Sequence, residues 1–163
     1  MSGSVIVADT NNLVINTPIV GQEYISLKIK TPSLDGEEIN YTDRVFSVFK
    51  IGVRSDLSQT SEIFEIHLTT PEFMKNNRTR ISKSYTGTID KIIEDVLRNE
   101  LFVNSRKPLF IEPTSGIRKI ISPNMNPYGL IRMLKEQAIS AQNQSPHFVF
   151  FENSKGLHFR SLQ

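Results

Sequence analysis

The side chains best suited to metal chemistry are three histidines, two of which, His147 and His158, lie near the C-terminus. Both belong to a predicted β-hairpin. With Phe151 opposite Leu157 across the turn, the two histidines project from opposite faces. They would share a metal only if this register were wrong by one residue.

The third histidine, His67, lies on the polar face of another predicted strand, with Glu65 as its same-face neighbour. Such a pair holds a metal only with ligands from elsewhere in the chain. Because the sequence has no cysteine, a thiolate zinc site, a disulfide framework and a cysteine nucleophile are excluded. We expect structural histidines and no metal site.

The sequence contains no local motif that is typical of an enzyme active site. There is no GxSxG elbow, Walker loop, GxGxxG or HExxH sequence. The carboxylate pairs Glu37-Glu38 and Glu94-Asp95 fall in a polar loop and on the solvent side of a predicted helix. Neither pair has the apolar surroundings that raise the pKa of a general acid. We expect no enzyme, no catalytic residues and no cofactor.

Positive charge is concentrated between Lys75 and Lys83, a segment that also contains Arg78 and Arg80 and is followed by Tyr85. The segment could bind phosphate or nucleic acid electrostatically. Alternatively, it is a solvated linker whose arginines pair with carboxylates of a neighbouring domain or subunit. No aromatic platform or RNP-like motif supports base stacking, which favours the linker. The net charge of +2 also argues against a dedicated nucleic-acid module.

The composition favours strands, since the chain has 19 Ile, 10 Val and 11 Thr but only 3 Ala. Apolar runs and alternation predict strands at 5–7, 13–15, 23–30, 45–51 and 62–69. Polar residues predict a long loop at 31–42 and a turn at 55–61. Together these elements predict an antiparallel barrel-like or sandwich-like sheet.

Two of these strands alternate with period two, which is typical of a half-buried strand. In 23–30 the residues that share the apolar face are Ile25, Leu27 and Ile29. In 62–69 the inward residues are Phe64, Ile66 and Leu68, with Glu65 and His67 pointing outward.

After Pro71 the pattern changes from strands alone to a mixture of helices and strands. Thr88 is a plausible N-cap for a helix that ends near Leu101, with Asp90 in its first turn. A second helix opens at Asn126-Pro127 and ends before Pro146. The apolar faces of the two helices are Ile89, Ile92, Ile93, Val96 and Leu97, and then Leu130, Ile131, Leu134 and Ala138.

Short strands are predicted at 109–112 and 117–121, and a C-terminal hairpin joins 147–151 to 157–161 around the loop 152–156. We expect Phe148, Phe150 and Phe159 to share one face of the hairpin, and Phe151 and Leu157 to share the other. A hairpin that is apolar on both faces is expected to be buried on both sides or to meet a partner.

We therefore predict an α+β fold with two domains. Residues 1–72 form an antiparallel, β-barrel-like domain, and residues 73–163 form a small α+β domain with two amphipathic helices and a C-terminal β-hairpin. No window approaches the ~18 apolar residues of a membrane span, so we expect no membrane insertion. Strands lie close to both ends of the sequence, and they are either two short edge strands or an indication that the sequence is a piece of a longer chain.

Several segments, taken in order, resemble the baseplate hub protein of contractile-tailed bacteriophages of the T-even type, particularly the marine and cyanophage branch. They are Gly21-Gln-Glu-Tyr24, Phe46-Ser-Val-Phe-Lys-Ile51, Glu62-Ile-Phe-Glu-Ile-His-Leu68, Pro71-Glu72, Arg78-Thr-Arg-Ile-Ser-Lys-Ser-Tyr85, Ser122-Pro-Asn-Met125, Phe150-Phe-Glu-Asn153 and Gly156-Leu-His-Phe-Arg-Ser-Leu162. No single segment is diagnostic, but their order and spacing extend over nearly the whole chain.

The resemblance implies a structural protein of the virion tail baseplate, assembled in the host cytoplasm. The family's hub is a homotrimer in which two similar tube domains per subunit build a pseudo-hexameric ring. This ring joins the tail tube to the central spike, contacts other baseplate proteins, and lets phage DNA pass through its lumen without specific binding. The N-terminal parts of type VI secretion spike proteins share the design.

The resemblance also implies that 1–72 correspond to much of the first tube domain and 73–163 to the domain inserted after it. Family members begin earlier and continue into a second tube domain, so we expect a fragment or a truncated homologue. The family contributes no catalytic residue in this region. The alternative hypothesis is a non-catalytic binding module that uses Lys75, Arg78, Arg80 and Lys83, possibly for nucleic acid.

Overall fold

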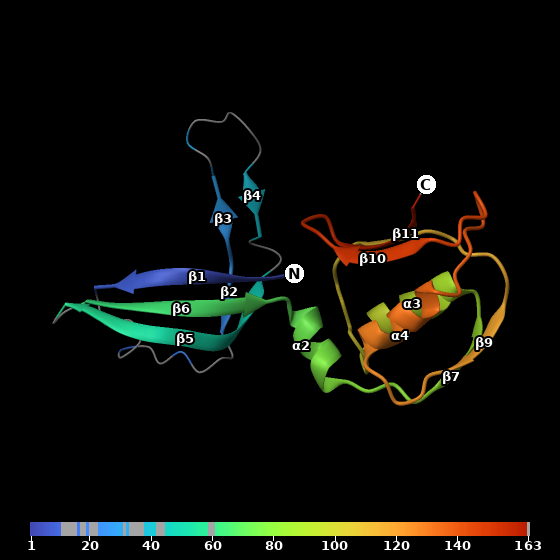
Figure 1. Ribbon diagram of the computed structural model, residues 1–163, viewed down its shortest axis with the longest axis horizontal. Coiled ribbons are helices and arrows are strands. Elements are labelled where there is room, and N and C mark those ends of the chain that lie inside the picture. The colour runs from blue at the N-terminus through green and yellow to red at the C-terminus, as the bar shows by residue number, and fades with distance from the viewer. Residues whose placement is uncertain are drawn as a thin grey trace. The chain divides into compact units, whose positions relative to one another are not determined.

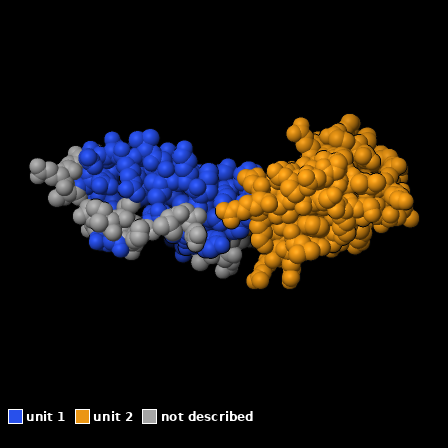
Figure 2. Space-filling model, turned by 90° about the horizontal axis from the view of Figure 1, so that it is seen from below, with its two compact units in different colours: residues 1–74 blue, residues 75–163 orange. Residues whose placement is uncertain are grey.

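The computed structural model describes residues 1–10, 16, 19, 23–30, 32, 38–41, 45–58 and 61–162. Within them the chain is a mixed α+β protein whose strands pair mostly antiparallel, as the sequence predicts. It divides into two compact units, residues 1–74 and 75–163 (Figure 2). The sequence pattern places the corresponding boundary at residue 72.

The first unit is built on a four-stranded antiparallel sheet with the strand order β1-β6-β5-β2. Its strands are β1 (Ser2–Asp9), β2 (Tyr24–Ile25), β5 (Phe46–Ser58) and β6 (Ser61–Thr69). The pairing of β5 with β6 shifts register at three places, and such bulges bend a sheet and increase its twist. The sheet curls into a half-barrel (Figure 1).

One face of this sheet carries the core of the first unit, made of Phe46, Val48, Phe64, Ile66 and Leu68. The alternation predicted for β6 is confirmed, because Phe64, Ile66 and Leu68 are all buried. Glu65 and His67 lie on the opposite face, where His67 Nε2 and Glu65 Oε2 are 3.6 Å apart. Successive strand residues point to opposite faces, which produces this segregation.

The segment predicted as one strand at 23–30 is instead two short strands. β2 pairs with β5, whereas β3 (Lys28–Ile29) pairs with β4 (Ile39–Asn40) in a separate ladder. Ile29 is 51% exposed because this ladder does not continue the apolar face of the larger sheet. β4 itself lies within the stretch predicted as a polar loop.

The prediction of a turn at 55–61 is wrong for most of these residues. β5 continues to Ser58, which pairs with Ser61 at the start of β6. Arg54 and Asp56 are exposed in this part of the strand, and a polar composition does not distinguish an exposed strand from a turn. The strand predicted at 13–15 lies outside the described residues.

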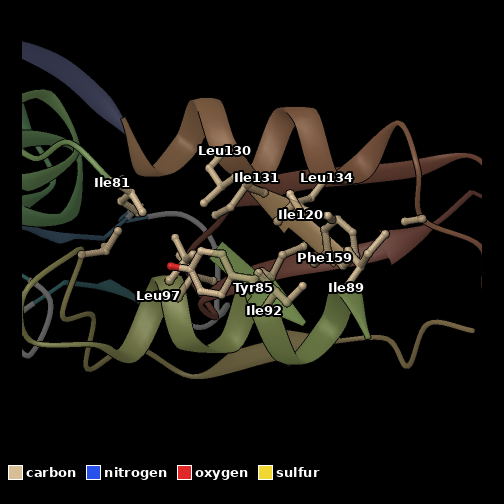
Figure 3. Packing of buried hydrophobic residues seen from close by; sticks show 14 of the residues in the cluster. Ile81, Tyr85, Ile89, Ile92, Leu97, Ile120, Leu130, Ile131, Leu134 and Phe159 are labelled. Atoms are coloured by element: carbon tan, nitrogen blue, oxygen red, sulfur yellow. The ribbon is translucent and has the colours of Figure 1, made fainter. Parts of the chain in front are cut away.

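In the second unit, two helices lie between two β-ladders (Figure 1). The helices are α3 (Ile89–Arg98) and α4 (Pro127–Lys135). One ladder has the order β10-β11-β8, with β10 at Phe148–Glu152, β11 at Leu157–Ser161 and β8 at Leu109–Ile111. The other pairs β7 (Ser84–Gly87) with β9 (Arg118–Ile121). Side chains from the helices and both ladders share one core cluster (Figure 3).

Both predicted helices are confirmed. The buried side chains of α3 and α4 include the predicted apolar faces: Ile89, Ile92, Ile93, Val96 and Leu97, and Leu130, Ile131 and Leu134. Ala138, predicted on the second face, is also buried, although α4 ends at Lys135. Asn126 caps α4, since its Oδ1 accepts a hydrogen bond from Gly129 N (2.7 Å), and Pro127 opens the helix.

The N-terminus of α3 is capped by a residue that is distant in sequence. Thr88 occupies the N-cap position, but its side chain makes no capping hydrogen bond. Thr114 Oγ1 instead accepts from Asp90 N (3.1 Å) and donates to Asp90 Oδ1 (2.7 Å). Burial raises the pKa of Asp90, but hydrogen bonds from Thr114 and Thr88 outweigh burial and hold the pKa below its ordinary value. The helix ends at Arg98, before the predicted Leu101.

The strands predicted at 109–112 and 117–121 are present, but they do not pair with each other. β8 runs parallel to β11, whereas β9 pairs antiparallel with β7. The sequence pattern gave no prediction of β7 or of the helix α2 (Pro71–Arg78). α2 overlaps the basic segment at 75–83, for which the sequence favours a solvated linker, and β7 follows that segment.

The C-terminal hairpin is confirmed, but its predicted register is wrong by one residue. Phe151 faces His158, and Leu157 faces Glu152. The loop therefore runs from 153 to 156 and is organised by Asn153, as its Oδ1 accepts from the backbone N–H groups of Lys155 (2.9 Å) and Gly156 (3.2 Å). Side-chain acceptors of this kind set a turn that apolar spacing alone does not locate.

The one-residue shift rearranges both faces of the hairpin. Leu157 and Phe159, two residues apart on β11, share the face that is buried in the core with Phe148, so the prediction that separated Leu157 from Phe159 is wrong. By the same parity, His147 and His158 fall on one face rather than on opposite faces.

Candidate interaction surfaces of residues 75–163

The predicted basic segment is not a linker along its whole length, because it begins on α2. Lys75 and Arg78 are exposed and occupy the last turn of this helix, with Glu72 in the first turn. Cations near a helix C-terminus and an anion near its N-terminus both complement the helix dipole. The signal for α2 was therefore present in the sequence as Pro71, Glu72, Lys75 and Arg78.

Asn76 attaches this end of α2 to α4. It is buried, and its Oδ1 accepts a hydrogen bond of 2.8 Å from Tyr128 N in the first turn of α4. The chain then enters the core at Ile81, whose N–H donates to Met125 O (2.8 Å). Lys75, Arg78 and Arg80 are thus exposed side chains on an anchored backbone.

Arg80 and Lys83 have partners within the segment's own surroundings. Arg80 Nη1 donates to the carbonyl oxygens of Asn77 (3.3 Å) and Thr79 (3.0 Å). Lys83 Nζ lies 3.2 Å from Asp95 Oδ2 of α3 and 4.7 Å from the ring centroid of Tyr85. Lys83 is therefore paired with α3 and Arg80 is bonded to nearby backbone, while all four basic side chains remain exposed.

The buried ring beside Lys83 is Tyr85. Burial, with a smaller contribution from the Asp95 carboxylate, raises the pKa of Tyr85 to about 12. The phenol therefore stays neutral at physiological pH. It contributes ring packing to the core rather than charge (Figure 3).

A second surface, which the wrong hairpin register concealed, is a stack of three rings across β8, β11 and β10. The ring of His158 lies between Phe110 and Phe151, with centroid separations of 4.6 Å and 4.8 Å and planes inclined by 10° and 4°. Phe151 at the β10 end is 43% exposed, whereas His158 is 7% exposed. Parallel rings at such spacing stabilise one another beyond simple burial.

His158 is held as a neutral hydrogen-bond donor. Its Nε2 lies 2.9 Å from Asn153 Oδ1, and an amide oxygen can only accept. Burial, followed by the charges of Arg160 and Lys155, lowers the pKa of His158. Although His147 and His158 share a face, no three His, Asp or Glu side chains gather as a metal site anywhere among the described residues.

Beside this stack is a groove of 690 Å³, lined by residues 109–113, Gln142 and residues 160–162. Its carboxylate, Glu112, accepts hydrogen bonds from Ser140 Oγ (2.5 Å), Ser161 N (2.8 Å) and Ser161 Oγ (2.9 Å). Burial raises the pKa of Glu112, but the hydrogen bonds from Ser140 and Ser161 outweigh it and lower the pKa overall. Glu112 is thus an ionised side chain that lines the groove and whose oxygens already accept hydrogen bonds.

None of the helices in the described residues is long and apolar enough to cross a membrane. No protein-family model matches the chain, and no curated protein matches it.

Proposed function

We propose that the chain is a structural component of a phage tail baseplate hub, part of a trimeric ring that connects the tail tube to the central spike. The observation that carries the proposal is the ordered resemblance of its segments, from Gly21 to Leu162, to the hub proteins of contractile-tailed phages. In this role the protein acts through its interfaces in the virion and needs no catalytic residue.

The first unit has features that suit such a ring. Its curled antiparallel sheet ends at β1, which pairs with β6 on one side and with no other described strand. An eight-residue edge strand presents a row of backbone donors and acceptors to a neighbouring chain. Its sequence, Ser-Gly-Ser-Val-Ile-Val-Ala-Asp, lacks the lysine or proline that commonly protects an edge.

The test is the assembly state of the full chain, measured by size-exclusion chromatography with multi-angle light scattering. We expect a trimer, or a trimer that forms when the tail-tube or spike protein of the same phage is added. A chain that stays monomeric and binds neither protein overturns the proposal.

A pair of matched variants locates the contact. Ile6→Lys places a charge on an exposed side chain of β1 and should weaken the assembly. Ile117→Lys changes an equally exposed isoleucine of the second unit and should leave the assembly intact.

The alternative is a nucleic-acid-binding module, favoured by the exposure of Lys75, Arg78 and Arg80. It predicts salt-dependent binding of a labelled oligonucleotide that weakens in the double variant Arg78→Gln/Arg80→Gln. The control is Arg118→Gln/Arg132→Gln, which removes two exposed arginines elsewhere in the second unit. If no oligonucleotide binds at low salt, the alternative is wrong.

A further inference from the structure

β8 forms an open edge of the β10-β11-β8 sheet. Leu157 N donates to Pro108 O (3.0 Å) and Glu112 N donates to Phe159 O (2.9 Å). This pattern, with Phe110 opposite His158, directs the backbone groups of Phe110 toward β11. The N–H and C=O groups of Leu109 and Ile111 alternate with these and point away from β11. No other described strand pairs with β8.

The groove is bordered by this edge strand and by residues 160–162 at the end of β11. All three residues of β8 line it, together with Glu112 and Pro113. Its volume of 690 Å³ falls within the roughly 300–1,000 Å³ typical of ligand sites. An extended backbone placed beside β8 would therefore find hydrogen-bonding partners and space for side chains together.

Arg160 brings a positive charge to this edge. It belongs to the central strand β11, yet its Cζ lies 5.7 Å from the ring centroid of Phe110 on β8. The guanidinium therefore extends over the edge strand, where the ring supports it by a cation–π contact. It is exposed and forms no ion pair within 4.0 Å among the described residues, although its charge contributes to lowering the pKa of Glu112 in the same groove.

The other charge in the groove is not available to a ligand. The oxygens of Glu112 already accept hydrogen bonds from Ser140 and Ser161. Arg160 is the group that can form new charge-assisted hydrogen bonds, and its planar fork matches a carboxylate.

We propose that the groove beside β8 binds an extended acidic segment of a partner protein. The segment would add to the sheet as a strand next to β8 and place one carboxylate against Arg160. Backbone pairing supplies affinity in this mode of recognition, and alternate side chains supply specificity. A nucleic acid fits less well, because a backbone of phosphates needs a row of cations and cannot pair with Leu109 and Ile111. The proposal does not depend on the hub function.

The test uses the full chain and the fluorescein-labelled peptide Thr-Val-Thr-Glu-Thr-Val-Thr, with a matched peptide carrying Gln in place of Glu. In anisotropy titrations the acidic peptide should bind at least about tenfold more tightly, as expected for one charge-assisted hydrogen-bonded pair. Arg160→Gln should make the two affinities equal. Arg132→Gln, an exposed arginine of α4, should leave the preference unchanged.

Backbone pairing is tested with two N-methylated forms of the acidic peptide. A strand presents alternate N–H groups to each side, so methylation of one alternate set should abolish binding and methylation of the other should not. The proposal is overturned if the acidic peptide shows no saturable binding up to about 1 mM. It is also overturned if Arg160→Gln has no effect, if both methylated peptides bind equally, or if a single-stranded oligonucleotide shows the Arg160-dependent binding instead.

Discussion

Gly156 passes so close to Pro108 that a Cβ at residue 156 would lie 2.3 Å from the Pro108 carbonyl oxygen. The same oxygen accepts the hydrogen bond from Leu157 N that begins the pairing of β8 with β11. Gly156 also has a φ of +153°, which other residues rarely adopt. The hairpin turn therefore approaches the start of β8 this closely only because residue 156 has no side chain.

Gly156→Ala should destabilise the second unit strongly. The strained φ alone contributes about 1–3 kcal/mol, and the clash with a backbone oxygen adds to it. Urea unfolding of the full chain, followed by circular dichroism, measures the loss. Gly87→Ala is the control, since no atom lies within 4 Å of its Cβ position, and a change within about 0.5 kcal/mol is expected. Equal stabilities of the two variants would contradict the steric argument.

Thr114→Val should destabilise the N-terminus of α3 by about 1–3 kcal/mol, because the Asp90 N–H and carboxylate both lose a hydrogen-bonding partner. The native pKa of Asp90 is lowered, so its ionisation contributes stability that is present above the ordinary pKa of 3.8 and is lost as the pH falls below it. Unfolding free energies of wild type and variant should therefore converge as the pH falls from about 7 toward about 3. A gap that stays constant would show that the hydrogen bond from Thr114 Oγ1 to the Asp90 carboxylate contributes nothing to the difference.

How much of the fold follows from sequence differs between elements. Local signals predicted α3 from the spacing of Ile89, Ile93 and Val96, and α4 from Asn126-Pro127. Local signals did not predict the contacts that join residues distant in sequence. β8 pairs in parallel with β11, 48 residues later at Leu109 and Leu157, and Thr114 caps a helix that begins 25 residues before it.

The candidate sites follow the same rule. The sequence located Lys75, Arg78, Arg80 and Lys83, but the partner of Lys83 is Asp95 on a different element. The sequence did not predict the ring stack, because the predicted register pairs Phe151 with Leu157 and so separates Phe151 from His158. A one-residue slip exchanges the partners of every side chain in the hairpin.

Lys107 and Glu152 form a largely buried ion pair, with Nζ and Oε1 2.5 Å apart and side chains 11% and 10% exposed. Lys107→Met removes this partner of the carboxylate and should lower the unfolding free energy by about 1–3 kcal/mol, as expected for a hydrogen bond to a charged group. The double variant Lys107→Met/Glu152→Leu should recover most of that loss, because it removes both charges. Lys91→Met, which breaks the exposed pair with Glu94, should change stability by less than about 1 kcal/mol. A double variant as unstable as the single one would contradict this prediction.

His158 should make the stability of the second unit decline in mild acid. Burial and the charges of Arg160 and Lys155 hold its native pKa below the ordinary value of 6.5. Between the native and unfolded pKa values, the unfolded chain binds a proton that the native state does not. Stability is therefore complete above about pH 6.5 and falls as the pH drops toward the native pKa.

His158→Phe keeps an aromatic ring between Phe110 and Phe151 but removes the titration, so its unfolding free energy should fall less between about pH 7 and pH 5. His147→Phe, at an exposed position before β10, is the control and should retain the wild-type decline. If His158→Phe and wild type decline equally, the acid sensitivity arises from other groups.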